Sequence, residues 1–179
     1  MNSDVHIDAR VEDLNWDNAR VLLEGIDLFL DGTDNFDTRY VLNDLSIETS
    51  IPWIYGACVG SYGLVLPVLR GDRKTPCLRC VLGDAPPPGT SPTCDTAGVL
   101  GTMAAVVASI QSTETIKVLL GRHDLLLQSL GQFDIWNNTR SVNSRSVTRS
   151  NDRVAPVDVS TQTRKWMPSG APSFTSSAS

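Results

Sequence analysis

The chain has 179 residues, of which 41% are hydrophobic, and it carries a formal net charge of −5 with a pI near 4.9. A chain of this length and composition can bury an ordinary core, and its acidic balance argues against a protein that neutralises nucleic-acid phosphates. No apolar run approaches the roughly 20 residues of a membrane span, and the first ten residues lack the basic and apolar parts of a signal peptide. We therefore expect a cytoplasmic protein that binds neither nucleic acid nor membrane.

The first half of the chain alternates between predicted strands and helices. Val5–Val11 predicts a short strand, and Asn15–Gly25 predicts a helix with Asn15 as its N-cap. Ile26–Asp31 is a short apolar run that predicts a buried parallel strand ending at a polar turn. Thr38–Thr49 is helical in composition. This order predicts an α/β fold with a largely parallel sheet, in which ligands lie outside the carboxyl ends of the strands.

The second half predicts two strands, a long loop, a helix and one or two final strands. The ranges, in chain order, are Ile51–Cys58, Tyr62–Arg70, the loop Gly71–Pro92, the helix Gly98–Leu120 and the strands within Leu125–Trp136. From residue 137 onward, Ser, Thr, Asn and Arg dominate, and this composition buries little surface. We therefore expect one domain over residues 1–140 and a disordered tail over residues 141–179.

The polar turn DGTDN (residues 31–35) follows the apolar strand, and Arg39 and Asn43 follow on the next predicted helix. Two carboxylates at a strand end, Asp31 and Asp34, can bind a hard cation such as Mg²⁺. Arg39 and Asn43 are suited to hold phosphate or carboxylate groups. The same residues are also ordinary turn and helix-capping chemistry, so the spacing leaves both interpretations open.

Cys77 and Cys80 form a CxxC pair with the spacing of two zinc ligands. A closed zinc site needs two more ligands, and the remaining cysteines, Cys58 and Cys94, do not form a second pair. A redox dithiol is the alternative, although the surroundings lack the usual strand-to-helix setting. A secreted protein with two disulfides is a further alternative.

Cys94 lies in the long polar segment, just before the predicted helix Gly98–Leu120. A helix N-terminus favours the thiolate, and a loop position gives access to a second macromolecule. A small buried apolar residue is the competing interpretation.

Several motifs together resemble those of the ThiF/MoeB/HesA family. The signature that follows the family's fourth strand is similar to the run DLFLDGTDNFDTRYVLND. The segments CLRC, TCDTAGVLG and SIQSTETIKVLLG then follow in the family's order and approximate spacing, and FDIW resembles a late strand. The match covers roughly residues 5–140.

The resemblance implies a partial Rossmann-like domain, with a mostly parallel sheet and antiparallel strands in its C-terminal half. It also implies an adenylyltransferase, usually a homodimer, that uses ATP and Mg²⁺ to activate the C-terminal glycine of a ubiquitin-like sulfur-carrier protein. Sulfur is then installed on the activated carboxylate for thiamine, molybdopterin or related pathways. This reaction needs a polarised α-phosphate and a held carboxylate, which a metal ion and an arginine supply.

The resemblance further implies roles for the motif residues. Those that it places at the nucleotide are Asp31, Asp34, Asn35, Arg39 and Asn43. Asp34 would lie at the Mg²⁺ ion, Arg39 would face the nucleotide and the carrier tail, and Asn43 would support them.

The cysteines also receive roles from the resemblance. Cys77 and Cys80 would be half of a structural zinc site. Cys94 would lie in the crossover loop over the carrier tail, where the matching cysteine of some members forms a covalent link to the carrier and that of others is dispensable. A thiolate at this position can attack an activated acyl group.

Two parts of the family pattern are missing from the sequence. The Gly-rich loop, with its strand and helix, should precede the residue that matches Val5, and no G-x-G-x-x-G run occurs. The second CxxC is also absent, which argues against zinc binding. Because backbone N–H groups of such a loop cradle the phosphates, we expect no ATP–pyrophosphate exchange by the isolated chain.

These departures leave three origins open: a fragment, which we favour, half of a split enzyme, or a degenerate relative. The leading function is that of an adenylyltransferase or a piece of one. A catalytically inactive module that binds a carrier protein or a dimer partner is the alternative, and a redox protein that uses Cys77 and Cys80 is the third.

Overall fold

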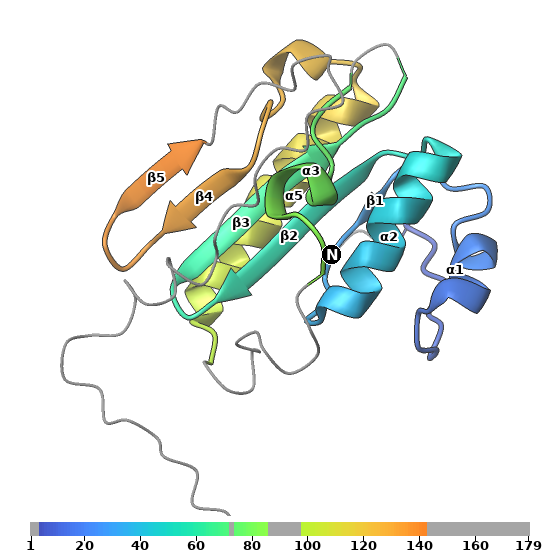
Figure 1. Cartoon of the computed structure of the whole chain (residues 1–179), viewed down its shortest axis with the longest axis horizontal. Coiled ribbons are helices and arrows are strands. Elements are labelled where there is room, and N and C mark those ends of the chain that lie inside the picture. Colours follow the sequence, from blue (N-terminus) through green and yellow to red (C-terminus); the bar gives the residue numbers. More distant parts are fainter. Residues whose placement is uncertain (1–3, 72–73, 86–97, 143–179) are drawn as a thin grey trace, which may run out of the picture.

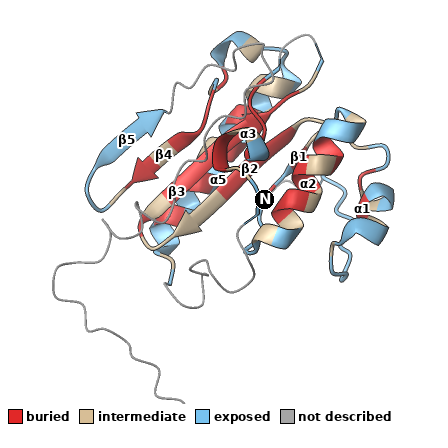
Figure 2. Cartoon of the chain, viewed as in Figure 1, coloured by how far each residue is buried: buried red, intermediate tan, exposed pale blue. Residues whose placement is uncertain are grey.

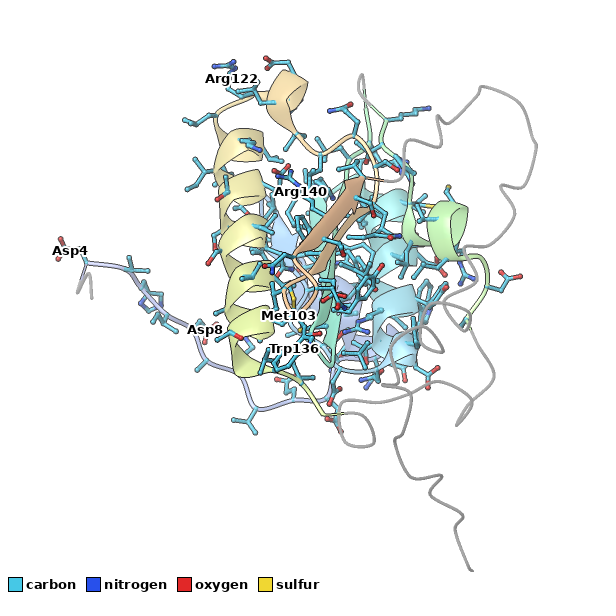
Figure 3. The ribbon with its side chains drawn as sticks, turned by 90° about the vertical axis from the view of Figure 1, so that its left-hand side faces the viewer. Asp4, Asp8, Met103, Arg122, Trp136 and Arg140 are labelled. Carbon is cyan, nitrogen blue, oxygen red and sulfur yellow. The ribbon has the colours of Figure 1, made fainter. Side chains whose placement is uncertain are left out.

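One five-stranded sheet with helices on both faces makes up the computed structural model, which describes residues 4–71, 74–85 and 98–142 (Figure 1). The strands, in their order across the sheet, are β1 (Phe29–Leu30), β2 (Trp53–Val59), β3 (Tyr62–Val68), β4 (Gly131–Asp134) and β5 (Thr139–Val142). The helices are α1 (Trp16–Leu22), α2 (Phe36–Thr49), α3 (Leu78–Leu82), α5 (Gly101–Leu119) and the 3₁₀ helix η1 (His123–Leu125). Figure 3 shows α5 on one face of the sheet and α2 and α3 on the other.

Asparagine side chains begin the first two helices. Asn15 accepts hydrogen bonds from the backbone N–H groups of Asp17 and Asn18, and the Asn18 side chain accepts one in return from the Asn15 backbone. Asn35 accepts a hydrogen bond from the backbone N–H of Thr38 at 2.8 Å. These bonds pair N–H groups that a helix terminus leaves free. The predicted N-cap at Asn15 is confirmed, and α2 begins two residues before its predicted start.

Strand direction changes within the sheet. β1 and β2 are parallel and are joined through α2, whereas β2–β3, β3–β4 and β4–β5 are all antiparallel. Only two residues, Gly60 and Ser61, separate β2 from β3, and Gly60 has a φ of 59°. A two-residue link permits only antiparallel pairing. The α/β class and the antiparallel C-terminal half are confirmed, while among the named strands of the described residues only β1 and β2 pair in parallel.

Two apolar clusters hold the sheet to its helices. The cluster under α1, α2 and α3 centres on Trp53, Tyr55 and Leu45, and the cluster under α5 centres on Ile54, Val65 and Met103. Figure 2 shows that β2 and β3 are largely buried, whereas β5 is exposed along its length. The central strands therefore fix the position of the β1 end, where the predicted site lies.

The N-terminal segment differs from the prediction. Val5–Val11 forms no strand, and Ile7 is 79% exposed. Figure 3 shows Asp4 and Asp8 on an extended segment that leads away from the sheet. Alternating apolar residues become a strand only where a neighbouring strand takes up their backbone hydrogen bonds, and the described part of the chain offers none to this segment.

Two short elements were missed. The predicted loop 71–92 contains α3, in which Leu78, Val81 and Leu82 are buried at helical spacing. β5 follows the turn at Asn138, whose φ is 54°, and extends to residue 142.

Residues 143–179 of the expected tail lie outside the described residues. Among the helices of the described ranges, none combines the length and the apolar character that a membrane crossing requires.

Replacing Gly63 with alanine is expected to lower the free energy of unfolding by about 1–3 kcal/mol, because the new methyl group overpacks the α5 cluster. A Cβ at this position would lie 2.6 Å from Val107 Cγ2 and would also overlap the end of Met103. Urea unfolding measures the change. Gly101→Ala is the matched control, since a Cβ there meets nothing within 4 Å, and an equal loss in both variants would contradict the packing argument.

Candidate active site

The chain turns sharply where β1 ends, and Asp31 organises this turn. Its Oδ1 atom accepts hydrogen bonds from the Thr33 backbone N–H at 2.8 Å and from the Thr33 hydroxyl at 2.7 Å. Asp31 is only 3% exposed. Because β1 pairs with β2 in parallel, the turn lies at the carboxyl end of that strand pair, where α/β sheets bind ligands.

Arg39 brings a buried positive charge to the same turn. Its Nε atom lies 3.5 Å from Asp31 Oδ2, and Nη2 donates to the backbone carbonyl of Thr33. The guanidinium carbon lies 5.8 Å from the centre of the Phe36 ring and 5.7 Å from that of Tyr55. Burial raises the pKa of Asp31, and the nearby Arg39 charge opposes that rise. The structure therefore brings two predicted site residues together as a buried ion pair.

Within the described residues, Asp31 Oδ2 and Arg39 Nε are inaccessible to solvent and make no hydrogen bond. They face each other at 3.5 Å, so each is the ion-pair partner of the other. Their opposite charges offset the cost of burying both groups. Both atoms lie beside the turn in which the sequence predicts nucleotide binding.

Asp34 and Asn35 lie on the outer side of the turn. Both residues are exposed, and Asn35 Nδ2 donates to Asp34 Oδ1 at 3.3 Å while its own Oδ1 caps α2. An accessible carboxylate that keeps a free oxygen can bind Mg²⁺, which retains several waters and uses one or two carboxylates. Asp34 therefore fits the predicted ion.

Asn43 lies on α2, four residues after Arg39, but its side chain contacts a different element. It is fully buried; its Oδ1 accepts from the Leu78 backbone N–H at 2.8 Å and its Nδ2 donates to Asp44 Oδ1 at 2.9 Å. These bonds attach α3 to α2. Direct nucleotide binding by Asn43 stays a prediction, and the contacts that the structure shows are structural.

Gln111, on α5, supports the turn and was missed by the sequence reasoning. Its Nε2 atom donates to the carbonyl oxygens of Asp31 and Ile54, both at 2.9 Å. A Cβ on Gly56 would lie 2.5 Å from Gln111 Cδ, so this glycine makes room for the amide. The signal in the sequence was a polar residue within the apolar stripe of the helix.

The two cysteines of the CxxC pair touch each other at the start of α3. Their Sγ atoms lie 2.8 Å apart; Cys77 is buried and Cys80 is half-buried. A hydrogen bond with Cys77 lowers the pKa of Cys80 below its usual range. The same contact, together with burial, raises the pKa of Cys77.

A closed zinc site takes four ligands, and the described residues include no group of three or more His, Cys, Asp or Glu side chains suited to a metal. A zinc ion at this pair would therefore need further ligands from outside the described residues, and its binding stays a prediction. Cys94 lies outside the described residues. Its predicted position near Asp34 therefore stays a prediction.

A comparison with models of protein families shows to which family the chain belongs. The family model described as "ThiF family" matches residues 1–155. The chain belongs to the ThiF family. The resemblance inferred from the DGTDN, CLRC and helix motifs is thereby confirmed.

Characterised relatives of this ThiF-family chain are longer than it is. It is 43% identical over 142 residues to the sulfur carrier protein ThiS adenylyltransferase of Bacillus subtilis, a match that covers 79% of this chain and 40% of that protein. It is 40% identical over 125 residues to the sulfur carrier protein adenylyltransferase of Thermus thermophilus, covering 68% of this chain and 46% of that protein. It is 35% identical over 139 residues to the SAMP-activating enzyme E1 of Haloferax volcanii, covering 78% and 50%. The chain thus spans half or less of the length of these relatives.

Solved structures of E. coli MccB share the fold. The structure with ATP matches with a TM-score of 0.58 at 13% identity and covers 74% of this chain and 41% of that one. The structure with MccA-N7isoASN matches with a TM-score of 0.60 at 13% identity and covers 74% and 42%. At this level of identity the likeness concerns the fold alone, and it supports the predicted α/β architecture.

Proposed function

We propose that this chain forms the part of an ATP-dependent adenylyltransferase that handles the metal ion and the acceptor carboxylate, and that it acts on the C-terminal glycine of a ubiquitin-like sulfur-carrier protein. The proposal draws its substrate class from the names of the relatives in Bacillus and Thermus. The observation that carries it is the buried Asp31–Arg39 ion pair beside the exposed carboxylate of Asp34.

Arg39 supplies a fixed positive charge. Its guanidinium is held by the Thr33 carbonyl and by two aromatic rings, so little reorganisation is needed when negative charge develops nearby. Preorganised charges of this kind lower the barrier to transfer at phosphorus. MgATP, when bound, supplies the electrophilic α-phosphorus that the carrier carboxylate attacks. Arg39 would orient that carboxylate and offset its charge.

Asp34 would hold the Mg²⁺ ion, and Asn35 would orient Asp34 through the hydrogen bond that it already donates. Asp31 would not touch the substrate and would position Arg39 through the ion pair. Asn43 would hold α3 against α2 through its hydrogen bond with Leu78 N–H. Cys94 is proposed as the sulfur that attacks the activated carboxylate. A phosphate cradle would be the part of the site for which the sequence offers no G-x-G-x-x-G run.

The same proposal covers the domain boundaries, the oligomeric state, the location and the pathway of the complete enzyme. Residues 1–140 would form the C-terminal portion of the adenylyltransferase domain, and residues 141–179 a disordered tail. The complete enzyme would be a cytoplasmic homodimer that serves thiamine or molybdopterin biosynthesis. The competing proposal is a catalytically inactive module that still binds a carrier protein.

A chimaeric enzyme tests the function. The matching segment of the Bacillus adenylyltransferase, which is 43% identical over 142 residues, is replaced by that of this chain, and ATP–pyrophosphate exchange is measured with a carrier protein that ends in Gly-Gly. We expect exchange, and we expect Asp34→Asn to reduce it at least about 100-fold, because the metal ion loses its carboxylate.

Asp37→Asn is the matched control, since Asp37 is an exposed carboxylate in the first turn of α2. It should keep the exchange rate within about twofold, as surface substitutions usually do. A folded chimaera that binds the carrier without exchange would favour the inactive module. Full exchange by Asp34→Asn would remove Asp34 from the proposed site.

A further inference from the structure

The hydrogen-bond ladder that joins β1 to β2 ends at the candidate site. Asp31 N–H donates to the Ile54 carbonyl at 3.1 Å. At the next position, the Asp31 carbonyl accepts a hydrogen bond from a side chain, the Nε2 amide of Gln111, at 2.9 Å. Because a regular parallel ladder pairs backbone groups with backbone groups, the place where β1 leaves β2 is set by a residue of α5.

One amide group serves both strands. Gln111 Nε2 also donates to the Ile54 carbonyl at 2.9 Å, so this oxygen accepts from the side chain and from the Asp31 N–H. A primary amide has two N–H donors and a carbonyl oxygen has two lone pairs, so all of these bonds can form together. Gln111 is 5% exposed. The two strands therefore receive a buried polar link at the point where they separate.

Gly56, on β2, leaves the space that this amide occupies. A Cβ on Gly56 would lie 2.5 Å from Gln111 Cδ and 2.7 Å from Oε1, closer than real Cβ atoms come to such neighbours. Its φ is not positive, so the backbone does not require glycine here. The missing side chain at position 56 and the amide at position 111 therefore fit each other.

The helix that carries Gln111 is held to the sheet at other points as well. At its start, Leu100 N–H donates to the Gly60 carbonyl at 2.8 Å. Three residues after Gln111, Glu114 Oε2 accepts from the Leu127 N–H at 2.9 Å. Because α5 cannot slide along the sheet without breaking these bonds, the amide has a defined position.

Asp31 transmits this position to the rest of the site. Its carboxylate accepts from the Thr33 N–H and hydroxyl groups and lies 3.5 Å from Arg39 Nε. Arg39 reaches the turn from α2 on one face of the sheet, and Gln111 reaches it from α5 on the other (Figure 3). The exposed Asp34 follows three residues after Asp31. The main-chain anchor at Asp31 therefore helps to determine how the guanidinium and the exposed carboxylate lie relative to each other.

We propose that Gln111 is a positioning residue for adenylation, which fixes the main chain of Asp31 and thereby the arrangement of Arg39 and Asp34. This inference rests on the proposed function. Gln111 touches neither the substrate nor the metal ion, so its loss should lower kcat and leave KM nearly unchanged, as when only transition-state interactions are lost. A misplacement of about 1 Å can cost about 100-fold in rate.

The chimaeric enzyme with the Bacillus segment replaced tests this role by ATP–pyrophosphate exchange. Gln111→Met keeps the length of the side chain and removes both N–H donors. We expect kcat to fall about 10–100-fold, with KM for MgATP and for the carrier protein within about threefold. Gln128→Met is the matched control, since Gln128 Nε2 also donates to two backbone carbonyls, those of His123 and Leu126. Its kcat should stay within about twofold.

The double variant Gly56→Ala/Gln111→Ala separates hydrogen bonding from packing. The new methyl group takes part of the space that the amide leaves, but no donor replaces the amide. We expect kcat to stay about 10–100-fold low. Recovery to within about threefold of the parent enzyme would overturn the inference, because filling the space would then suffice. A folded Gln111→Met enzyme with unchanged kcat would overturn it too, and the double variant decides where Gln111→Met does not fold.

Hydrogen exchange in the full chain tests the same anchor without adenylation. The Thr33 N–H, which donates to Asp31 Oδ1, should exchange about tenfold faster in Gln111→Met, measured relative to the amides of β3. Gln128→Met should leave this rate unchanged. An unchanged Thr33 rate in Gln111→Met would contradict the inference. A parent chimaera without pyrophosphate exchange would count against the proposed function instead, and the Thr33 rate would still show whether Gln111 holds the turn.

Discussion

Arg39→Met is expected to lower the free energy of unfolding by about 3–5 kcal/mol at neutral pH, because it leaves the buried Asp31 carboxylate without its counter-charge. The side chains of Asp31 and Arg39 are 0% and 8% exposed. Methionine keeps the length and much of the volume of arginine, so lost packing against Tyr55 and Phe36 contributes little. Urea unfolding of the full chain measures the difference.

The double variant Asp31→Asn/Arg39→Met separates the charge from the other contacts. Asparagine keeps an oxygen that can accept the hydrogen bonds which the Thr33 N–H and hydroxyl groups donate to Asp31. It carries no charge. We expect the double variant to recover most of the lost stability, since a buried ion pair often does no more than balance its own desolvation. A double variant as unstable as Arg39→Met would show that the guanidinium acts through packing.

The pH dependence gives a second readout for the same pair. Burial raises the pKa of Asp31 above its usual value near 3.8, and Arg39 opposes this rise, so Arg39→Met should raise the pKa further. A carboxyl group whose pKa is higher in the folded state than in the unfolded state costs stability above the folded pKa, and this cost fades as pH falls to the unfolded pKa. The loss in free energy of unfolding caused by Arg39→Met should therefore become smaller toward pH 4. The loss caused by the double variant should not change with pH. A deficit that is equal at both pH values would contradict this account.

The parts of the site that the sequence predicted are those that depend on neighbouring residues. Asp31 ends a short apolar strand, and Asn35 begins the next helix, and both are local signals that a strand–turn–helix pattern makes visible. The Asp31–Arg39 contact is compatible with the same pattern, since the two residues lie only eight positions apart. The direction of β3 was also encoded locally by the two-residue link at Gly60 and Ser61, although the alternation of elements had favoured parallel strands.

The parts that escaped prediction depend on contacts between distant segments. The Gln111 side chain donates hydrogen bonds to the backbone carbonyls of Asp31 and Ile54, which are 80 and 57 positions away. A local sequence pattern cannot predict a partner at such a distance along the chain. The Asn43 oxygen accepts from the backbone N–H of Leu78, 35 positions along the chain, and this contact was likewise not visible in the local sequence. Helix periodicity shows which face a residue occupies, but the element that packs on that face is set by tertiary structure.

Trp53→Ala is expected to cost about 3–5 kcal/mol of stability, the range for removing a large buried aromatic side chain. Trp53 is 0% exposed and lies in the strand next to β1. Its ring stacks on Phe29 at a centroid distance of 6.0 Å and meets Tyr55 edge-on at 5.7 Å. Because Phe29 belongs to β1 and Tyr55 contacts the Arg39 guanidinium, the loss should also loosen the turn that holds Asp31.

Two controls make this second prediction specific. Trp16→Ala removes an indole that is 54% exposed, and it should cost much less, because most of that side chain is already in water. Trp53→Phe keeps an aromatic ring between Phe29 and Tyr55 and removes the buried indole N–H, for which the described residues supply no hydrogen-bond partner. Its cost should lie well below that of Trp53→Ala. Thermal and urea unfolding rank the three variants, and equal losses in Trp16→Ala and Trp53→Ala would mean that the cluster under α1, α2 and α3 is not the core that positions the site.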